Sequence, residues 1–400
     1  MKKLMFLGGA NHQLNAIHNA KINNIHTICC DNVKTNPGHK IAHESFIIST
    51  TERLNILNLA KELKLDGIMT YGSDVSLRSL GLVCDELGLQ GLSENQAILF
   101  GDKKKFRKFL NENNLQKTNF VELSSKDFKT ENEILKLLEN HNIHYPVIVK
   151  PSDRSGGTGI TKCSQKKEVC IAIEKAKKES LSNSVIIEEF IESNGAQICG
   201  DGFLKDGEII FIGLGNNFFH KQSFGPFAEV FPNIENINRK EIIDKIEKIF
   251  KLANYSNGPF NFDIIRRHNG EFFIVELTPR LGGNFLSEAI QRAYGVDLIN
   301  ENILLSLNQS TFQDTSFDQS EKYFFNLMLH IKKPLQKKIE GKTNFLNNTP
   351  VHIKMYDIEN VKFCSNGAMS NFLGNALFQF NDHESVLDFV NHLYHEDFVY

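Results

Sequence analysis

The first hundred residues alternate short apolar runs with amphipathic helical patterns, and this alternation restricts the fold more than any other feature of the chain. The runs KLMFLGG, IHTICCD and LDGIMTYG are each followed by a segment whose apolar residues recur at helical spacing. Parallel strands need long crossover connections, so strands that alternate with helices predict a parallel sheet covered on both faces. We therefore predict a doubly wound α/β domain at the N-terminus.

Charge and apolar patterning restrict the partners and the location. Lys and Arg number 45 against 48 Asp and Glu, a net charge of −3, which gives no general electrostatic reason for a nucleic-acid or membrane partner. The apolar runs are far shorter than the roughly 20 residues that span a bilayer. The seven cysteines form no CxxC pair, as in proteins with reduced thiols. We expect a cytoplasmic protein that binds neither nucleic acid nor membrane.

A β-hairpin with two opposed acids is the most informative local pattern. Asn269-Gly270 is a strong two-residue turn signal between the strands FNFDIIRR and EFFIVEL. A two-residue turn gives cross-strand pairs with a constant sum of residue numbers, namely His268 with Glu271, Ile265 with Ile274 and Asp263 with Glu276. Directly opposed carboxylates repel each other and destabilise a sheet. A positive charge is therefore expected between the two acids, and both Mg²⁺ and Arg280 are candidates.

The segment VIVKPSDRSGGTGI carries a lysine beside a glycine-rich loop. A strand ends near Lys150, and the loop 152–159 contains three glycines, which let backbone N–H groups approach an anion closely. The segment lacks the GK[ST] ending of a Walker loop, and its flanking elements are strands. It predicts a flap over phosphates, with a structural glycine hairpin as the alternative.

Other segments allow two interpretations each. Glu188 and Glu189 end the apolar strand SVIIEEFI, where a hinge could read the edge of a base or the strand could simply stop. Lys103 in GDKKKFRKF could reach an anion or belong to a solvated basic helix. GGANHQ, with Asp31 about twenty residues on, partly matches a dinucleotide site but lacks the later glycines, which favours a plain tight turn.

Taken in this order, these segments resemble the ATP-grasp superfamily, in particular its carboxylate–amine ligase branch with the biotin carboxylase and phosphoribosyl-aminoimidazole carboxylase type enzymes. The resemblance covers about residues 1–310 and includes DGIMTYGSD, the glycine-rich segment, IIEEFI and VELTPRLGGN. It implies an α/β and α+β fold with four parts. These are a pre-ATP-grasp domain (1–105), a mobile lid subdomain with the glycine-rich loop (106–190), an antiparallel catalytic lobe (191–310) and a region that completes this lobe (311–400).

The resemblance also implies roles for individual residues. ATP phosphates would contact Lys103, Lys150 and the loop residues Ser155, Gly156, Gly157 and Gly159. Adenine would contact Glu188 and backbone groups at Glu189 and Ile191. Mg²⁺, or Mn²⁺ as an alternative, would be held by Asp263, Glu276 and Thr278. The catalytic residues would be Lys150 and Arg280, of which Arg280 would steady the transferred phosphoryl group or the acyl phosphate.

Two departures from the family pattern matter, and the substrate contacts are less specific. Gln197 stands near the position of a ribose-binding acid, and Thr278 stands where many relatives have Asn. Relatives hold their substrates near the positions of Ser73, Asp74, His220, Lys221 and Asn284. For His220 the alternative is an ordinary surface or core histidine.

The implied activity is an ADP-forming ligase that activates a small carboxylate as an acyl phosphate and joins it to an amine. Phosphoryl transfer needs positioning and charge neutralisation rather than a protein nucleophile, which fits lysines, arginine and Mg²⁺. Three alternatives stay open: an ATP-grasp kinase, a non-catalytic nucleotide-binding protein and a nicotinamide-dependent dehydrogenase that uses GGANHQ. The acid, the amine and the oligomeric state are not specified, and a homodimer is left open.

Overall fold

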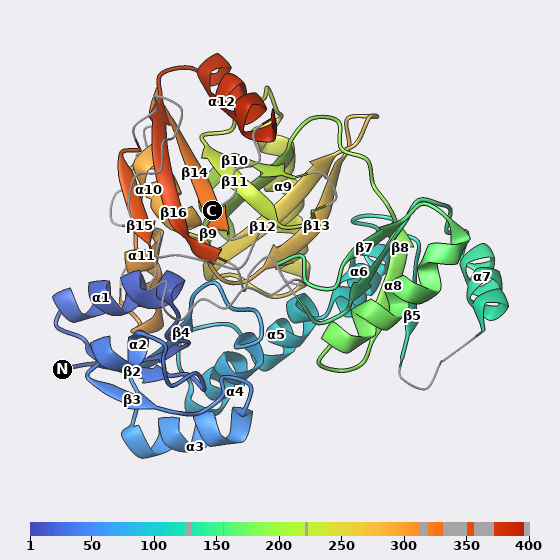
Figure 1. Cartoon of the computed structure of the whole chain (residues 1–400). Coiled ribbons are helices and arrows are strands. Elements are labelled where there is room, and N and C mark those ends of the chain that lie inside the picture. Colours follow the sequence, from blue (N-terminus) through green and yellow to red (C-terminus); the bar gives the residue numbers. More distant parts are fainter. Residues whose placement is uncertain are drawn as a thin grey trace, which may run out of the picture.

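The computed structural model contains three β-sheets and the helices that cover them (Figure 1). It describes residues 1–124, 130–154, 156–220, 223–309, 311–312, 319–330, 350–355 and 372–395. Within these ranges no helix is both long enough and apolar enough to cross a membrane.

The N-terminal sheet is parallel, with strand order β3-β2-β1-β4. Its strands are β1 (Lys3–Leu7), β2 (His26–Cys30), β3 (Glu44–Phe46) and β4 (Gly67–Thr70). The connecting helices are α1 (Leu14–Ile22), α2 (Gly38–Ile41) and α3 (Arg53–Leu63), with a 3₁₀ turn at Asn11–Gln13. The predicted doubly wound arrangement is therefore confirmed.

Apolar residues cover both faces of this sheet, as its strand pattern predicted. Met5 and Ile28 face a core with α3 and α4 (Leu77–Leu87), whereas Leu4 and Phe6 face α1 and α11 (Leu298–Ser306). The chain then leaves the sheet through α5 (Glu94–Gly101) and α6 (Lys103–Glu112). Helix α11, which comes about two hundred residues after this sheet in the sequence, thus completes the N-terminal unit.

A small antiparallel sheet follows, with strand order β5-β8-β6-β7. It consists of β5 (Phe120–Leu123), β6 (Val147–Pro151), β7 (Thr161–Cys163) and β8 (Val185–Glu189), with α7 (Glu131–Asn140) and α8 (Lys166–Glu179) packed on it. In Figure 1 this green unit stands apart at one side of the molecule and is joined to the rest through α6. This is the region in which the sequence predicted the lid.

The third sheet has eight strands in the order β13-β12-β9-β10-β11-β14-β16-β15. The strands are β9 (Gln197–Lys205), β10 (Glu208–Phe219), β11 (Pro226–Phe231), β12 (Gly258–Arg266), β13 (Phe272–Thr278), β14 (Tyr323–His330), β15 (His352–Met355) and β16 (Phe372–Phe380). Strands β14 to β16 come from the last eighty residues and extend the sheet built by β9 to β13. Helices α9 (Arg239–Leu252) and α12 (His383–His395) pack on one face, and α10 (Leu286–Tyr294) packs on the other.

The hairpin of β12 and β13 differs from the predicted register near its turn. Arg267 N donates to Glu271 O at 2.9 Å, so the loop has three residues, His268 to Gly270, and His268 does not face Glu271. Ile274 lies opposite Ile264 rather than Ile265. A bulge between Asp263 and Ile264 adds one residue on β13 and shifts the pairing back. The predicted pair of Asp263 with Glu276 is therefore confirmed.

Candidate functional site

The opposed carboxylates lie on neighbouring strands at one edge of the eight-stranded sheet. Asp263 Oδ1 accepts hydrogen bonds from Gln197 Nε2 and Asn217 Nδ2, both at 2.9 Å. Burial, and then the negative charge of Glu276, raise the pKa of Asp263 to about 7. The neutral amides orient this carboxyl group without supplying the positive charge that its ionised form needs.

Arg280 does not neutralise the acid pair through an ion pair. Among the ion pairs of the described residues, its Nε bonds Asp74 Oδ1 at 2.6 Å, whereas Glu276 Oε1 lies 3.3 Å from Lys103 Nζ. Lys103 Nζ also donates to the Arg154 carbonyl at 2.6 Å. The candidate phosphate lysine therefore lies directly beside the acid pair.

The oxygen atoms around the acid pair fit a magnesium ion. Thr278 follows Glu276 by two residues on β13, so both side chains point to one face of the sheet. Thr278 Oγ1 is buried and has no hydrogen-bond partner, which is costly for a hydroxyl group. Two carboxylates with an unsatisfied hydroxyl form a hard oxygen donor set of the kind that Mg²⁺ prefers. The described residues contain no group of three or more His, Cys, Asp or Glu that could hold a metal.

A second buried charge cluster lies on the lid side, and we name it the lid cluster: Lys150, Glu188 and Arg107. Glu188 forms ion pairs with Lys150 Nζ and with Arg107 Nε, the latter at 3.0 Å. Burial alone would raise the pKa of Glu188, but Arg107 and Lys150 together hold it at about 2. Burial lowers the pKa of Lys150 to about 8, and Glu188 opposes this shift. The side chain predicted to bind adenine is thus paired with the predicted phosphate lysine.

Arg107 also connects the lid cluster to the hairpin. Its Nη2 donates to Val275 O at 2.8 Å and its Nη1 donates to Ile274 O at 3.3 Å. Gln116 Nε2 donates to the same Ile274 carbonyl at 3.0 Å, and Gln116 Oε1 accepts from Ile274 N at 2.6 Å. These bonds fix the backbone at the bulge that brings Glu276 opposite Asp263. The sequence analysis did not identify Arg107 or Gln116.

The glycine-rich loop lies against the connection between β10 and β11. Gly156, Gly157 and Gly159 have positive φ angles of 63°, 74° and 72°. A Cβ atom at Gly157 would lie 2.9 Å from Gly225 N, so the loop backbone closely approaches the connection between β10 and β11. Ser155 lies outside the described residues. Glu189 ends β8 opposite Val147 on β6, and Ile191 follows two residues later.

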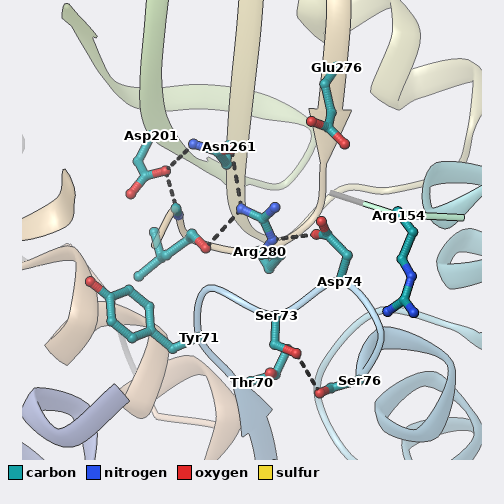
Figure 2. Close-up of polar contacts among 12 residues, drawn as sticks. Thr70, Tyr71, Ser73, Asp74, Ser76, Arg154, Asp201, Asn261, Glu276 and Arg280 are labelled. Atoms are coloured by element: carbon teal, nitrogen blue, oxygen red, sulfur yellow. Dashed lines mark hydrogen bonds and ion pairs between the residues drawn. The ribbon is translucent and has the colours of Figure 1, made fainter. Parts of the chain in front are cut away.

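Arg280 is held in a network that Figure 2 shows around the end of β13. Its Nη1 donates to Asn261 Oδ1 and to the Leu281 carbonyl, both at 3.2 Å. Asn261 Nδ2 in turn donates to Asp201 Oδ1 at 3.0 Å. In Figure 2 the remaining amino group of Arg280 points toward Glu276. The guanidinium is thus fixed on two sides and directed toward Glu276 on the third.

Asp201 anchors this network through further hydrogen bonds. The carboxylate is fully buried and accepts from Gly282 N at 2.8 Å and from Ser287 Oγ at 2.6 Å. Burial raises the pKa of Asp201 to about 6, although these hydrogen bonds oppose the shift. Asp201, Asn261 and Gly282 are far apart in sequence, so only the fold shows that they act together. Sequence reasoning did not identify Asp201 or Asn261.

The predicted substrate residues fall into two groups. Ser73 and Asp74 follow β4, where Asp74 binds Arg280 and Ser73 Oγ lies 2.8 Å from Ser76 Oγ. Asn284 has a φ of 57°, and its carbonyl accepts from Asn326 and Asn375 at 2.8 and 3.0 Å. His220 instead stacks on Phe227 with ring centroids 4.3 Å apart, and Lys221 lies outside the described residues.

The GGANHQ turn is filled by its own side chains. A Cβ atom at Gly8 would lie 2.3 Å from Gln13 Nε2. Asp31 Oδ2 accepts from Gly9 N at 2.8 Å and from Asn36 Nδ2 at 2.7 Å. The acid that would bind a ribose is therefore committed to the turn itself. This arrangement argues against the dehydrogenase alternative.

A cleft of about 510 Å³ opens beside the acid pair. It is lined by residues of the N-terminal unit, of the lid segment and of β13, including Asp74, Lys103, Arg154, Glu276 and Thr278. A volume of this size accommodates a small metabolite. The cleft therefore brings a substrate-sized space to the residues that the sequence motifs singled out.

Comparison with known proteins agrees with this geometry. The family described as carbamoyl-phosphate synthase L chain, ATP binding domain, matches residues 102–312, more than half of the chain. The carbamoyl phosphate synthase large chain of Saccharolobus islandicus is 25% identical over 283 residues. The alignment covers 67% of this chain but only 25% of that relative, so the chain spans about a quarter of it.

Two solved structures share the fold over nearly the whole chain. The L-amino acid ligase of Bacillus licheniformis has a TM-score of 0.79 at 16% identity, covering 98% of this chain and 97% of that one. The biotin carboxylase domain of the Hydrogenobacter thermophilus 2-oxoglutarate carboxylase, in complex with MgADP, ADP and bicarbonate, has a TM-score of 0.72 at 17% identity. That comparison covers 97% of this chain and 88% of the other. The predicted ATP-grasp fold is thereby confirmed, and the chain belongs to the family of the carbamoyl-phosphate synthase L chain ATP-binding domain.

Proposed function

We propose that the chain is an ADP-forming ligase that activates a small carboxylate with ATP and joins it to an amine. The observation that carries the proposal is the acid pair, because the half-buried Asp263 lies opposite Glu276 without a direct ion pair to Asp263 among the described residues. The names of its structural relatives, a ligase and a carboxylase domain with bound MgADP, support the same class of reaction. The membership in an ATP-binding family supports ATP as the nucleotide.

Separate groups of residues would bind the nucleotide and its metal ion. Lys103, Lys150 and the glycine-rich loop would bind the ATP phosphates, and the hinge at Glu189 and Ile191 would bind adenine through its backbone. Asp263, Glu276 and Thr278 would hold Mg²⁺, with Mn²⁺ as a second candidate. When bound, such an ion neutralises charge on the phosphate oxygens.

Arg280 is the residue best placed to act on the reacting groups. Asp74 and Asn261 fix its guanidinium, and the remaining amino group points toward Glu276. In this position it would bind the substrate carboxylate and then stabilise the acyl phosphate formed from it. A preorganised cation of this kind stabilises developing charge without rearranging during the reaction.

Exclusion of water is the second requirement of this chemistry, because an acyl phosphate hydrolyses readily. The glycine-rich loop already lies against the β10–β11 connection, where the closeness of Gly157 to Gly225 leaves little space. Closure of the lid segment over the cleft would remove the remaining solvent before the amine attacks.

The test is a reaction screen with the purified chain, ATP and Mg²⁺. We expect ADP and phosphate to form fastest when an acid and an amine are both present, and mass spectrometry should detect a product lighter by water than the sum of both. A phosphorylated acid as the final product would instead support the kinase alternative. A lack of ATP binding and turnover with a broad panel would contradict the proposal.

The location and the assembly of the protein stay predictions. We propose a cytoplasmic enzyme that acts on small molecules, and a homodimer stays open. Gel filtration of the purified chain would measure the assembly directly.

A further inference from the structure

We propose that the acid activated by this chain carries a second anionic group, a carboxylate or a phosphate, which Arg78 binds at the mouth of the cleft. The inference rests on the proposed function, since it concerns the substrate of that same site. It restricts the substrate to acids with at least two anionic groups.

The cleft has a distinct inner end and a distinct mouth. Asp74, Glu276 and Thr278 are half-buried or buried and form the inner end beside Arg280. The mouth is formed by exposed lining residues from the N-terminal unit and the lid segment: Thr51, Arg53, Arg78, Lys105, Leu181 and Ser182. A substrate held at the inner end by its reacting carboxylate therefore extends toward these residues.

Charge is distributed unevenly between the two ends. The acids that line the cleft are all half-buried, whereas the exposed charged residues of its lining are the cations Arg53, Arg78 and Lys105. Asp102 accepts hydrogen bonds from backbone N–H groups at the start of α6, and Asp153 accepts from Leu181 N and Ser182 N. These hydrogen bonds orient the two half-buried acids without cancelling their charge, and the exposed charged residues at the mouth are all cations.

The two arginines at this mouth differ in their ion pairing. Arg53 is paired with Glu94, but Arg78 forms no ion pair within 4.0 Å among the residues that the structure describes. Arg78 is also the second residue of α4, whose first turn contains no acidic residue. A helix N-terminus is itself positive, so an arginine there lacks the anion that would normally stabilise this end. An incoming carboxylate or phosphate would pair with the guanidinium of Arg78 and stabilise the positive N-terminus of α4.

The chemistry of arginine explains why both anions are candidates. Its planar guanidinium binds a carboxylate or a phosphate through two parallel hydrogen bonds. Lys105 at the same mouth adds a second cation that can approach the anion from another side. The length of the substrate is limited by the cleft volume of about 510 Å³, which corresponds to a small metabolite.

The test compares acids with and without a second anionic group. Isothermal calorimetry with the full chain, Mg²⁺ and ADP would use succinate, glutarate and adipate against their monoamides, and 3-phosphoglycerate against glycerate. We expect at least one dianion to bind about tenfold more tightly than its partner of lower charge, the effect typical of one charge-assisted contact. The carboxylate and phosphate series distinguish the two sources of the second anion.

Variants assign this preference to one side chain. Arg78→Ala should remove the tenfold preference and leave the binding of the monoamides unchanged, whereas Arg78→Lys should restore part of it. Arg292→Ala is the matched control, because Arg292 is exposed on α10 and does not line the cleft. Equal binding within every pair, or the same loss in Arg292→Ala, would overturn the inference.

Turnover separates this inference from the proposed function. Release of ADP with monoacids as fast as with diacids, unchanged in Arg78→Ala, would leave the ligase standing and reject the second anion. A dianion preference that depends on Arg78, without ADP release for any amine, would reject the ligase and keep the anion subsite.

Discussion

Two groups of charged side chains, the buried lid cluster and the half-buried acid pair, have opposite electrostatic environments in the same chain. In the lid cluster Glu188 lies between two cations, and its pKa is held at about 2. In the acid pair Asp263 has amide partners, and its pKa is raised to about 7. Glu188 has two cations as direct partners, whereas Asp263 has none among the described residues, and Lys103 contacts the other acid of the pair, Glu276.

The difference indicates what each group contributes. The lid cluster stabilises the junction between the lid segment and the hairpin even without ligands. The acid pair, in which Asp263 has no cationic partner, lowers the stability of the unliganded chain. A bound cation would therefore stabilise this pair more than the lid cluster. Variants of the two groups should therefore separate stability from activity.

The largest effect is expected for Glu276→Gln. This change removes one carboxylate from the acid pair but keeps its shape, so we expect ADP release to fall about 1,000-fold, as for loss of a strong electrostatic contact to the reacting phosphates. The free energy of unfolding should stay the same or rise, because repulsion with Asp263 disappears. Steady-state kinetics and urea unfolding measure the two quantities.

The control for this variant lies on the same hairpin. Glu271→Gln removes an exposed acid that pairs with Arg267 near the turn, and it should change neither rate nor stability noticeably. Full activity of Glu276→Gln with Mg²⁺ would show that the metal is assigned to the wrong residues.

The hairpin also shows how far the sequence alone predicts this site. The Asn269-Gly270 signal correctly located the turn, and the register correctly placed Asp263 opposite Glu276. The predicted pairs nearer the turn were wrong, because the loop has three residues rather than two. The bulge at Val275 shifts the register back by one residue, so the pairing at Asp263 is again the predicted one. No local pattern distinguishes a bulge held by Arg107 and Gln116 from a regular strand.

Long-range partners explain most of what the sequence did not predict. The elements of the N-terminal unit and the lid segment followed from local periodicity, which needs no distant contact. Arg107 looked like one more cation of a solvated basic helix, yet its partner Glu188 lies 81 residues away and it is 1% exposed. Asp201 likewise gave no signal, because its partners Asn261 and Gly282 come from other strands and turns.

The second prediction tests the lid cluster, in which Glu188 has two cationic partners. Arg107→Met should lower the free energy of unfolding by about 3 kcal/mol, because it leaves Glu188 with one cation and the Val275 carbonyl at the bulge without its donor, whereas the Ile274 carbonyl keeps its bond from Gln116. Urea unfolding measures this loss. Lys108→Met, at the neighbouring exposed position, should cost less than about 0.5 kcal/mol.

Asp201 provides an intermediate case, a buried acid held by hydrogen bonds rather than by a direct ion pair. Asp201→Ala should lower kcat about 100-fold, because Gly282 and Asn261 lose their anchor and Arg280 moves from its position. The KM for ATP should change little, and Asp201→Asn should recover part of kcat. A rise in the KM for ATP with unchanged kcat would contradict a role in positioning Arg280.

The smallest expected effect is a difference in pH dependence between the two groups. The pKa of Asp263 is raised by folding to about 7, so its contribution to stability is complete below about pH 4 and is lost as the pH rises toward 7. The pKa of Glu188 is lowered to about 2, so its contribution is complete above about pH 4.5 and is lost as the pH falls toward 2.

Thermal unfolding midpoints without nucleotide, measured from pH 3 to pH 8, would resolve these opposite slopes. Asp263→Asn should flatten the decline between pH 4 and pH 7, and Glu188→Gln should flatten the loss below pH 4.5. Mg²⁺ with ADP should raise the Tm of the unchanged chain by a few degrees more at pH 8 than at pH 6, because the ion binds the ionised carboxylate. An equal increase in Tm at both pH values, or the same increase in Asp263→Asn, would mean that the metal does not bind the ionised carboxylate of Asp263.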